Sequence, residues 1–301
     1  MTRFMGNMAL FETWYDLMAP FTPKSRWYAL TPEEQAVVPA RIYDHLLKDD
    51  PYYAVMFDRP ATSGLDEATI IAALGEKIAG WLDGQPYFFR TNLLSPKDAG
   101  LCRVENAEDV LDLLLRSRRL YRVSPVMGAT PLTLVFREWC TPYEEFRCFV
   151  ENGRIKALSQ YDDSDSIMKA NGASEFYPLT PTDYVRLATY IQAVVDTTHL
   201  DTAVLDVARG DDGFWVVEIN PFSPITDTCL FVLEDIYDTP LPDPEIRYWV
   251  GPFIIGRLTY SAGRWHVRAP LPVSQTPPPE PWISQVLSHI VGPATPVTSL
   301  E

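Results

Sequence analysis

The segment that most constrains this chain is DTAVLDVARGDDGFWVVEINPF, at Asp201–Phe222. It predicts two apolar strands, Thr202–Ala208 and Phe214–Ile219, joined by a tight polar turn. Asp-Asp-Gly between two β-rich segments is typical of a hairpin. The chain must therefore build its sheet around this antiparallel pair.

Three polar residues occupy strand positions where apolar residues are expected, namely Asp206, Glu218 and Asn220. Side chains two apart on a strand share a face, so Glu218 and Asn220 point the same way. Closure of the hairpin brings Asp206 beside Glu218. Carboxylates this close repel each other unless a cation joins them, and an all-oxygen cluster suits Mg²⁺. The alternative is an edge hairpin with solvated acids.

A polar loop near residues 90–100 carries a first pair of cations. Arg90 and Lys97 bracket this loop just beyond a predicted strand, and Ser95 lies between them. Such residues can bind phosphate: arginine donates two parallel hydrogen bonds, and lysine contributes a compact positive charge. The alternative is ordinary surface charge.

Two later strands add further polar candidates. Glu138 and Trp139 end one strand, where a hinge between lobes could bind a flat base, although an ordinary edge strand has the same pattern. Arg147 is an inward cation in an amphipathic strand, and Gln160 ends the next strand as a weaker candidate. A basic set facing the acidic cluster is what magnesium with a polyphosphate requires.

Several functional classes are disfavoured. The net charge of −15 opposes a general nucleic-acid or membrane binder. The chain has no glycine-rich phosphate motif, no GxSxG and no zinc pattern among its four cysteines, which we expect to be reduced thiols. A glycoside hydrolase could use paired carboxylates, but it leaves the cations unexplained. With no apolar segment long enough to span a membrane, we expect a soluble cytoplasmic protein.

The order of elements predicts an α+β fold with two lobes. We expect an N-terminal lobe at 1–130, a C-terminal lobe at 131–238 and a proline-rich extension at 239–301. Periodicity and capping signals predict the individual elements. The expected helices are 31–48, 65–82, 106–118, 181–198, 227–237 and 282–291, and the expected strands outside the hairpin are 53–57, 86–89, 132–139, 145–150, 154–160, 253–260 and 265–268.

Five segments together resemble the cell division cycle protein 123 family, a branch of the ATP-grasp superfamily. They are FREWC at 136–140, EFRCFV at 145–150, LSQ at 158–160, LDV at 205–207 and EINPF at 218–222. The loop RTNLLSPKDA at 90–99 aligns with the family's phosphate-side loop, and ITDTCLF at 225–231 continues the match. The resemblance covers roughly residues 11–238.

This resemblance implies an ATP-grasp fold whose two lobes enclose an ATP·Mg²⁺ site. By motif position Asp206, Glu218 and Asn220 would hold the metal. The residues that would contact the nucleotide are Arg90, Lys97 and Arg147 at the phosphates, Glu138 and Trp139 at the adenine, and Gln160.

The chain also departs from the family pattern. Arg90 and Lys97 exchange the usual lysine and arginine, Glu218 replaces an aspartate, and Tyr161 replaces a basic residue. The charges at 90 and 97 survive the exchange, so the ATP site is still expected. The Glu-x-Asn form at 218–220 is the one common in catalytically active ATP-grasp ligases.

Two functions remain open. The family resemblance implies an ATP-dependent assembly factor for a protein complex of the translation initiation factor two type. The alternative is an ATP-grasp ligase that activates a carboxylate as an acyl phosphate for attack by an amine, with Arg147 stabilising the developing charge. A third possibility is a pseudoenzyme that binds ATP only for structural integrity.

Overall fold

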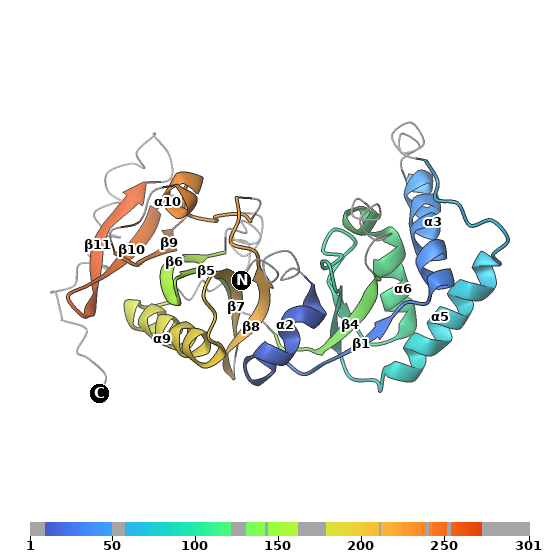
Figure 1. Cartoon of the computed structure of the whole chain (residues 1–301), viewed down its shortest axis with the longest axis horizontal. Helices are drawn as coiled ribbons and strands as arrows, with labels where there is room; N and C mark the ends of the chain where they lie inside the picture. Colours follow the sequence, from blue (N-terminus) through green and yellow to red (C-terminus); the bar gives the residue numbers. More distant parts are fainter. Residues whose placement is uncertain are drawn as a thin grey trace. The chain divides into compact units, whose positions relative to one another are not determined.

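The structure is a computed structural model that divides the chain into two compact units, Met1–Thr141 and Pro142–Glu301 (Figure 1). It describes residues 10–49, 58–121, 131–141, 144–161, 179–210, 212–224, 226–238, 241, 243–251 and 254–272. Helices and antiparallel strands are mixed in both units. The predicted α+β class is therefore confirmed.

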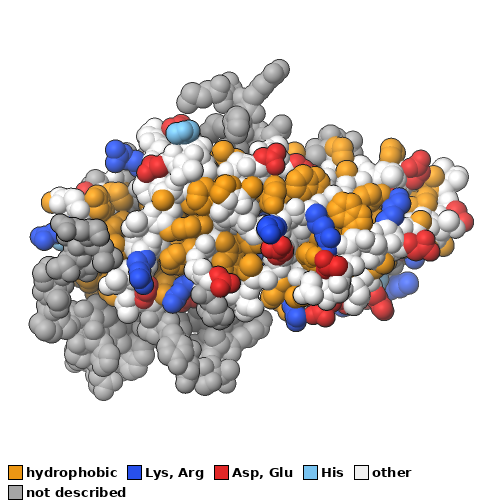
Figure 2. Space-filling model, turned by 90° about the horizontal axis from the view of Figure 1, so that it is seen from below, with side chains coloured by type: hydrophobic (Ala, Val, Ile, Leu, Met, Phe, Trp, Pro, Cys, Tyr) orange, Lys and Arg blue, Asp and Glu red, His pale blue; other side chains and the backbone are white. Residues whose placement is uncertain are grey.

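The surface carries both signs of charge despite the net charge of −15. On the face in Figure 2, acidic and basic side chains are interspersed among apolar ones rather than gathered into one field. Within the described ranges, no helix is sufficiently long and apolar to cross a membrane.

The first unit is a four-stranded antiparallel sheet with helices, in the strand order β1-β4-β2-β3. Its elements are α2 (Phe11–Met18), η1 (Ala19–Phe21), β1 (Ser25–Ala29), α3 (Pro32–Asp49), α5 (Glu67–Trp81), β2 (Tyr87–Thr91), β3 (Arg103–Val104), α6 (Ala107–Arg116) and β4 (Thr133–Glu138).

Capping motifs form at the predicted N-termini of helices α3 and α6. At the start of α3 the Thr31 hydroxyl accepts from the Glu34 amide at 3.3 Å, and the Glu34 carboxylate accepts from the Thr31 amide at 2.8 Å. At α6 the Asn106 side chain accepts from the Asp109 amide at 2.9 Å. These bonds satisfy amides that lack partners within their helix, so the helices begin where the sequence predicts.

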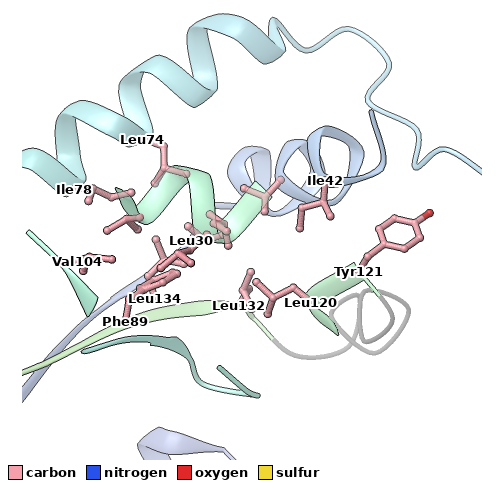
Figure 3. Close-up of a cluster of buried hydrophobic side chains, with 14 of the residues drawn as sticks. Leu30, Ile42, Leu74, Ile78, Phe89, Val104, Leu120, Tyr121, Leu132 and Leu134 are labelled. Atoms are coloured by element: carbon pink, nitrogen blue, oxygen red, sulfur yellow. The ribbon is translucent and has the colours of Figure 1, made fainter. Parts of the chain in front are cut away.

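The core of the first unit lies between its sheet and its three longer helices (Figure 3). Ile42, Leu74 and Ile78 point from α3 and α5 toward Phe89 and Leu134 on the strands, and all five side chains are buried. Burial of one such side chain contributes about 1.5–3 kcal/mol. The predicted apolar stripe of α5 thus joins this core through Leu74 and Ile78, and α5 itself packs against α3 and α6.

The second unit has a seven-stranded sheet in the order β11-β10-β9-β6-β5-β7-β8. Neighbours are antiparallel except β6 and β9, which are parallel. Its elements are β5 (Glu144–Glu151), β6 (Arg154–Gln160), α9 (Pro181–Thr198), β7 (Ala203–Gly210), β8 (Gly213–Asn220), α10 (Leu233–Tyr237), β9 (Glu245–Gly251), β10 (Ile254–Ser261) and β11 (Arg264–Pro272).

The two faces of this sheet are covered differently. On one face Tyr184 of α9 packs edge-on against Phe146 of β5, with ring centroids 6.0 Å apart. On the other face Phe149, three residues further along β5, contacts Phe222, and it also meets Phe231. We call the described residues 221–224 and 226–238, which include α10, the covering segment. Arg147 of β5 and Asp206 of β7 share the face that this segment covers.

Three sequence predictions differ from the structure. Residues 227–232 are not helical, so the helix expected at 227–237 shrinks to α10. Strand β9 was not predicted, and it joins the expected extension to the main sheet. The division follows Thr141 instead of residue 130, because β4 pairs with β1 and β2. The elements expected at 53–57 and 282–291 lie outside the described residues.

Close packing between β9 and β10 gives a test of this added strand. A Cβ atom at Gly256 would collide with the ring of its register partner Tyr248, which stacks on Tyr184 at 4.3 Å. We expect Gly256→Ala to lower the free energy of unfolding by about 1–3 kcal/mol in denaturant titrations. The control is Gly80→Ala in α5, where a Cβ meets no atom within 4 Å and alanine stabilises a helix by about 0.5–1 kcal/mol. Equal effects at the two glycines would contradict the packing of β9.

Candidate functional site

The hairpin that the sequence predicts is formed by β7 and β8. Asp206 is the register partner of Glu218, and Val204 is the partner of Asn220. The register then shifts, because Val207 pairs with Val216 and leaves one additional residue in β8. Such a bulge re-aims neighbouring side chains and is common beside functional sites. The predicted proximity of Asp206, Glu218 and Asn220 is thus a feature of the structure.

The next strand places Arg147 beside this pair. Arg147 of β5 is the register partner of Asp206, and its Nε and Nη2 atoms donate to Asp206 Oδ1 and Oδ2, both at 2.8 Å. The two side chains are 6% and 3% exposed. This bidentate pair is a buried, charge-assisted contact, which is the strong kind of hydrogen bond.

A second carboxylate lies beside this pair. Asn220 Nδ2 donates to Asp206 Oδ2 at 3.0 Å and to Glu218 Oε1 at 3.4 Å. Burial raises the pKa of the Asp206 carboxyl, Arg147 opposes this rise, and the nearby charge of Glu218 adds to it. Since neighbouring carboxylates repel each other, a cation bound here would relieve the repulsion.

These residues belong to a polar row that crosses the sheet. The row consists of register partners on five neighbouring strands, namely Glu218, Asp206, Arg147, Ser159 and Arg247. Directly opposed residues point to the same face of a sheet. The row therefore lies on the face of the covering segment.

Side chains of the row hold the covering segment through its main chain. Arg147 Nη1 donates to the Asp227 carbonyl at 2.9 Å, and Arg247 Nη1 donates to the Leu230 carbonyl at 3.1 Å. Ser159 Oγ accepts from the Leu230 amide at 3.0 Å. The site and the segment thus share hydrogen bonds.

Gln160 ends β6, and Tyr161 follows it directly. Gln160 Oε1 accepts from the Trp249 amide at 2.9 Å, so its carboxamide oxygen joins β6 to β9. The Tyr161 ring lies 4.8 Å from the Arg147 guanidinium, and Nη2 of that arginine donates to the Tyr161 hydroxyl at 3.3 Å. Sequence reasoning noted Tyr161 only as a departure from the family, yet it contacts the central cation.

The remaining predicted site residues lie in the first unit. Arg90 is 2% exposed, and its Nε donates to the Thr91 carbonyl at 3.0 Å, whereas Lys97 is exposed. Glu138 is exposed, while its amide donates to the Lys24 carbonyl at 2.9 Å. Trp139 Nε1 donates to Thr141 Oγ1 at 3.3 Å. These four residues thus belong to one sheet and the chain segments that adjoin it.

The donor set of the second unit fits a hard cation. No group of three His, Cys, Asp or Glu side chains suited to a metal occurs in the part of the chain that the structure describes. The candidate metal ligands in this unit are therefore the carboxylates of Asp206 and Glu218 and the amide oxygen of Asn220. Oxygen ligands of this kind suit Mg²⁺, which usually keeps several waters and binds through only one or two carboxylates.

Sequence reasoning missed the polar residues that support the row. Glu245 accepts from Arg247 at 2.7 Å and from Arg257 Nη2 at 2.7 Å, and the hydrogen bonds from the two arginines lower its pKa although burial opposes this. Asp235 accepts from Arg247 at 3.0 Å. The alternation of Glu245 and Arg247 with Ile246 and Tyr248 was the available signal, because it has the period of a strand.

The charge balance of the site predicts opposite effects of two conservative substitutions. Asp206→Asn leaves the buried Arg147 without its ionic partner, and we expect a loss of about 3–5 kcal/mol in the free energy of unfolding. Glu218→Gln removes the like charge but keeps an oxygen for Asn220, so Tm should rise by roughly 2 °C. Thermal and chemical denaturation without added metal measure both effects. Similar losses for the two variants would contradict the described charge balance.

Comparison with known proteins yields one family. Residues 84–250, more than half of the 301-residue chain, match the family model D123. The translation initiation factor eIF2 assembly protein of Schizosaccharomyces pombe is 28% identical over 272 residues, 79% of this chain and 80% of that protein. The protein of the same name from Candida albicans is 27% identical over 52% of this chain and 50% of its own length.

The solved structures agree with this result. The structure of Cdc123 from Schizosaccharomyces pombe aligns with a TM-score of 0.55 and 25% identity, over 79% of this chain and 94% of that chain. The expected fold and the resemblance stated from the sequence motifs are therefore confirmed. On the match of its residues 84–250, the chain belongs to the D123 family.

Proposed function

We propose that this chain binds ATP with Mg²⁺ and acts as an ATP-dependent assembly factor for a protein complex of the eIF2 type. The observation that carries the proposal is the buried Arg147–Asp206 pair with Glu218 opposite, in a member of the D123 family. Curated relatives in this family are named eIF2 assembly proteins, which supports the assembly role.

In this proposal the second unit supplies the metal-binding residues. Asp206 and Glu218 hold the cation by carboxylate oxygens, and Asn220 presents its amide oxygen after rotating the amide that now donates to both carboxylates. Bound Mg²⁺ would neutralise the charge of the phosphates. The covering segment and the buried apolar cluster around Phe149 limit access of water to these groups.

The first unit, taken by itself, carries further residues that we propose bind nucleotide. Arg90 and Lys97 bind phosphate oxygens, one from a buried strand end and one from an exposed loop position. Glu138 and Trp139 bind the adenine, where main-chain groups and an indole ring suit a flat base. In the second unit, Gln160 at the end of β6 contributes through its amide nitrogen, because its oxygen accepts from the Trp249 amide.

Thermal denaturation with nucleotide tests the binding site. At an ATP concentration about 100 times Kd, with Mg²⁺, binding adds about 2.7 kcal/mol to the free energy of unfolding and raises Tm. We expect Glu218→Gln to abolish most of this rise while the variant stays folded, and Asp206→Ala to abolish it as well. The matched control is Glu234→Gln, an exposed acid of α10 in the same unit. An unchanged Tm of the unsubstituted protein with Mg-ATP would refute the ATP site.

Binding to a partner tests the assembly role separately from the ATP site. Purified eIF2 subunits from Schizosaccharomyces pombe, presented one at a time, should yield one subunit that the chain retains. Retention should strengthen with Mg-ATP and lose that increment in Glu218→Gln. Absence of binding to every subunit, together with ADP and phosphate release in the presence of a carboxylate and an amine, would replace the assembly role by the ligase alternative.

A further inference from the structure

We infer that Arg147 is a positioning residue that fixes the metal-binding carboxylate of Asp206 and joins it to the covering segment, in place of contacting phosphate directly. The inference rests on the proposed Mg-ATP site and assigns a different role within it. It follows from where the three guanidinium nitrogens donate.

All three nitrogens of Arg147 donate to oxygen atoms of the protein itself. Nε and Nη2 donate to the two oxygens of Asp206, and Nη1 donates to the Asp227 carbonyl. Nη2 also donates to the Tyr161 hydroxyl. A guanidinium carries five N–H donors in a fixed fork, so these bonds also fix the plane of the group.

Burial and stacking further restrict this guanidinium. The Arg147 side chain is 6% exposed, and the Tyr161 ring lies 4.8 Å from the guanidinium carbon. A phosphate oxygen that took one of these four N–H donors would displace its partner and leave a buried carboxylate, carbonyl or hydroxyl without its donor. Leaving such a group unpaired is unfavourable, so the present bonds are expected to persist when ligand binds.

The consequence for the metal concerns the Asp206 carboxylate. Both of its oxygens are oriented by Arg147, and Asn220 adds a bond to one of them. Groups that orient a metal ligand in this way change metal affinity by about 10–100-fold when they are removed. The carbonyl of Asp227 is bound by the same guanidinium, so the carboxylate and the covering segment are positioned together.

Arg147→Lys separates the two roles. Lysine keeps the positive charge but cannot donate in parallel to both oxygens of Asp206 and to the Asp227 carbonyl. We would titrate Mn²⁺ at fixed ATP and follow the rise in Tm, which yields a midpoint in Mn²⁺ and a plateau. A positioning role moves the midpoint upward by about 10–100-fold and leaves the plateau near that of the unsubstituted protein. A phosphate contact lowers the plateau and leaves the midpoint unchanged, which would overturn the inference.

Arg247→Lys is the matched control for loss of a buried guanidinium. Arg247 lies in the same polar row, and it bonds to Glu245, Asp235 and the Leu230 carbonyl. Its substitution should lower the basal Tm without moving the Mn²⁺ midpoint. If Arg247→Lys shifts the Mn²⁺ midpoint as much as Arg147→Lys does, the shift reflects the loss of any buried guanidinium. That result would overturn the inference.

Tyr161→Phe keeps the inference testable if Arg147→Lys does not fold. It retains the stacked ring and removes only the hydroxyl that Arg147 Nη2 contacts. The midpoint should rise by a factor of about 2–3 with an unchanged plateau, a smaller change than removal of the whole guanidinium. A lowered plateau would contradict positioning.

The same titration separates failure of the inference from failure of the proposed function. If the unsubstituted protein does not respond to Mn²⁺ and ATP, the proposed function itself is refuted. If it responds normally but the variants keep the same Mn²⁺ midpoint, only the role of Arg147 is refuted.

Discussion

The second unit is organised around one buried ion pair, Arg147 with Asp206. Removing two charges from water costs several kcal/mol for each ion, which excellent geometry and additional hydrogen bonds must offset. The structure meets this requirement, because the carboxylate receives two bonds from the guanidinium and one from Asn220. The guanidinium in turn reaches the Asp227 carbonyl. Strands β5, β7 and β8 and the covering segment therefore depend on the same few polar atoms.

The division of the sheet into an apolar and a polar face explains how such charges are accommodated. One face of β5 carries Phe146 against α9, as in an ordinary core. On the opposite face apolar contacts surround Phe149, while the polar row continues through Ser159 to Arg247. Buried charges there are paired or bonded to main chain, as the low interior dielectric demands. The covering segment is held by these polar bonds together with apolar contacts of Phe231 and Ile236.

The sequence predicted those parts of this arrangement that depend on local signals. The hairpin and the proximity of Asp206 to Glu218 follow from the Asp-Asp-Gly turn and from the two-residue alternation of side chains along a strand. The bulge in β8 was not predicted. The pairing of Arg147 with Asp206 was not predictable by parity, because β5 and β7 are separated in sequence by β6 and α9. Strand β9 was missed since Glu245 and Arg247 occupy inward positions that normally carry apolar residues. Residues 227–232 have helical periodicity but do not form a helix, because their backbone bonds to side chains of the sheet. Cys229 in this stretch has a φ of 54°.

The second carboxylate is the feature that structural stability alone does not explain. Arg147 already pairs with Asp206, and the negative charge of Glu218 raises the pKa of this buried carboxyl. A neutral glutamine at position 218 would preserve the hydrogen bond from Asn220 and avoid the repulsion. The acid therefore costs stability in the absence of a cation, and strain or repulsion of this kind is typical of binding sites. Together with the amide of Asn220, the repulsion between these neighbouring carboxylates is the strongest physical argument that the hairpin binds a metal ion, because a cation turns the unfavourable contact into a favourable one.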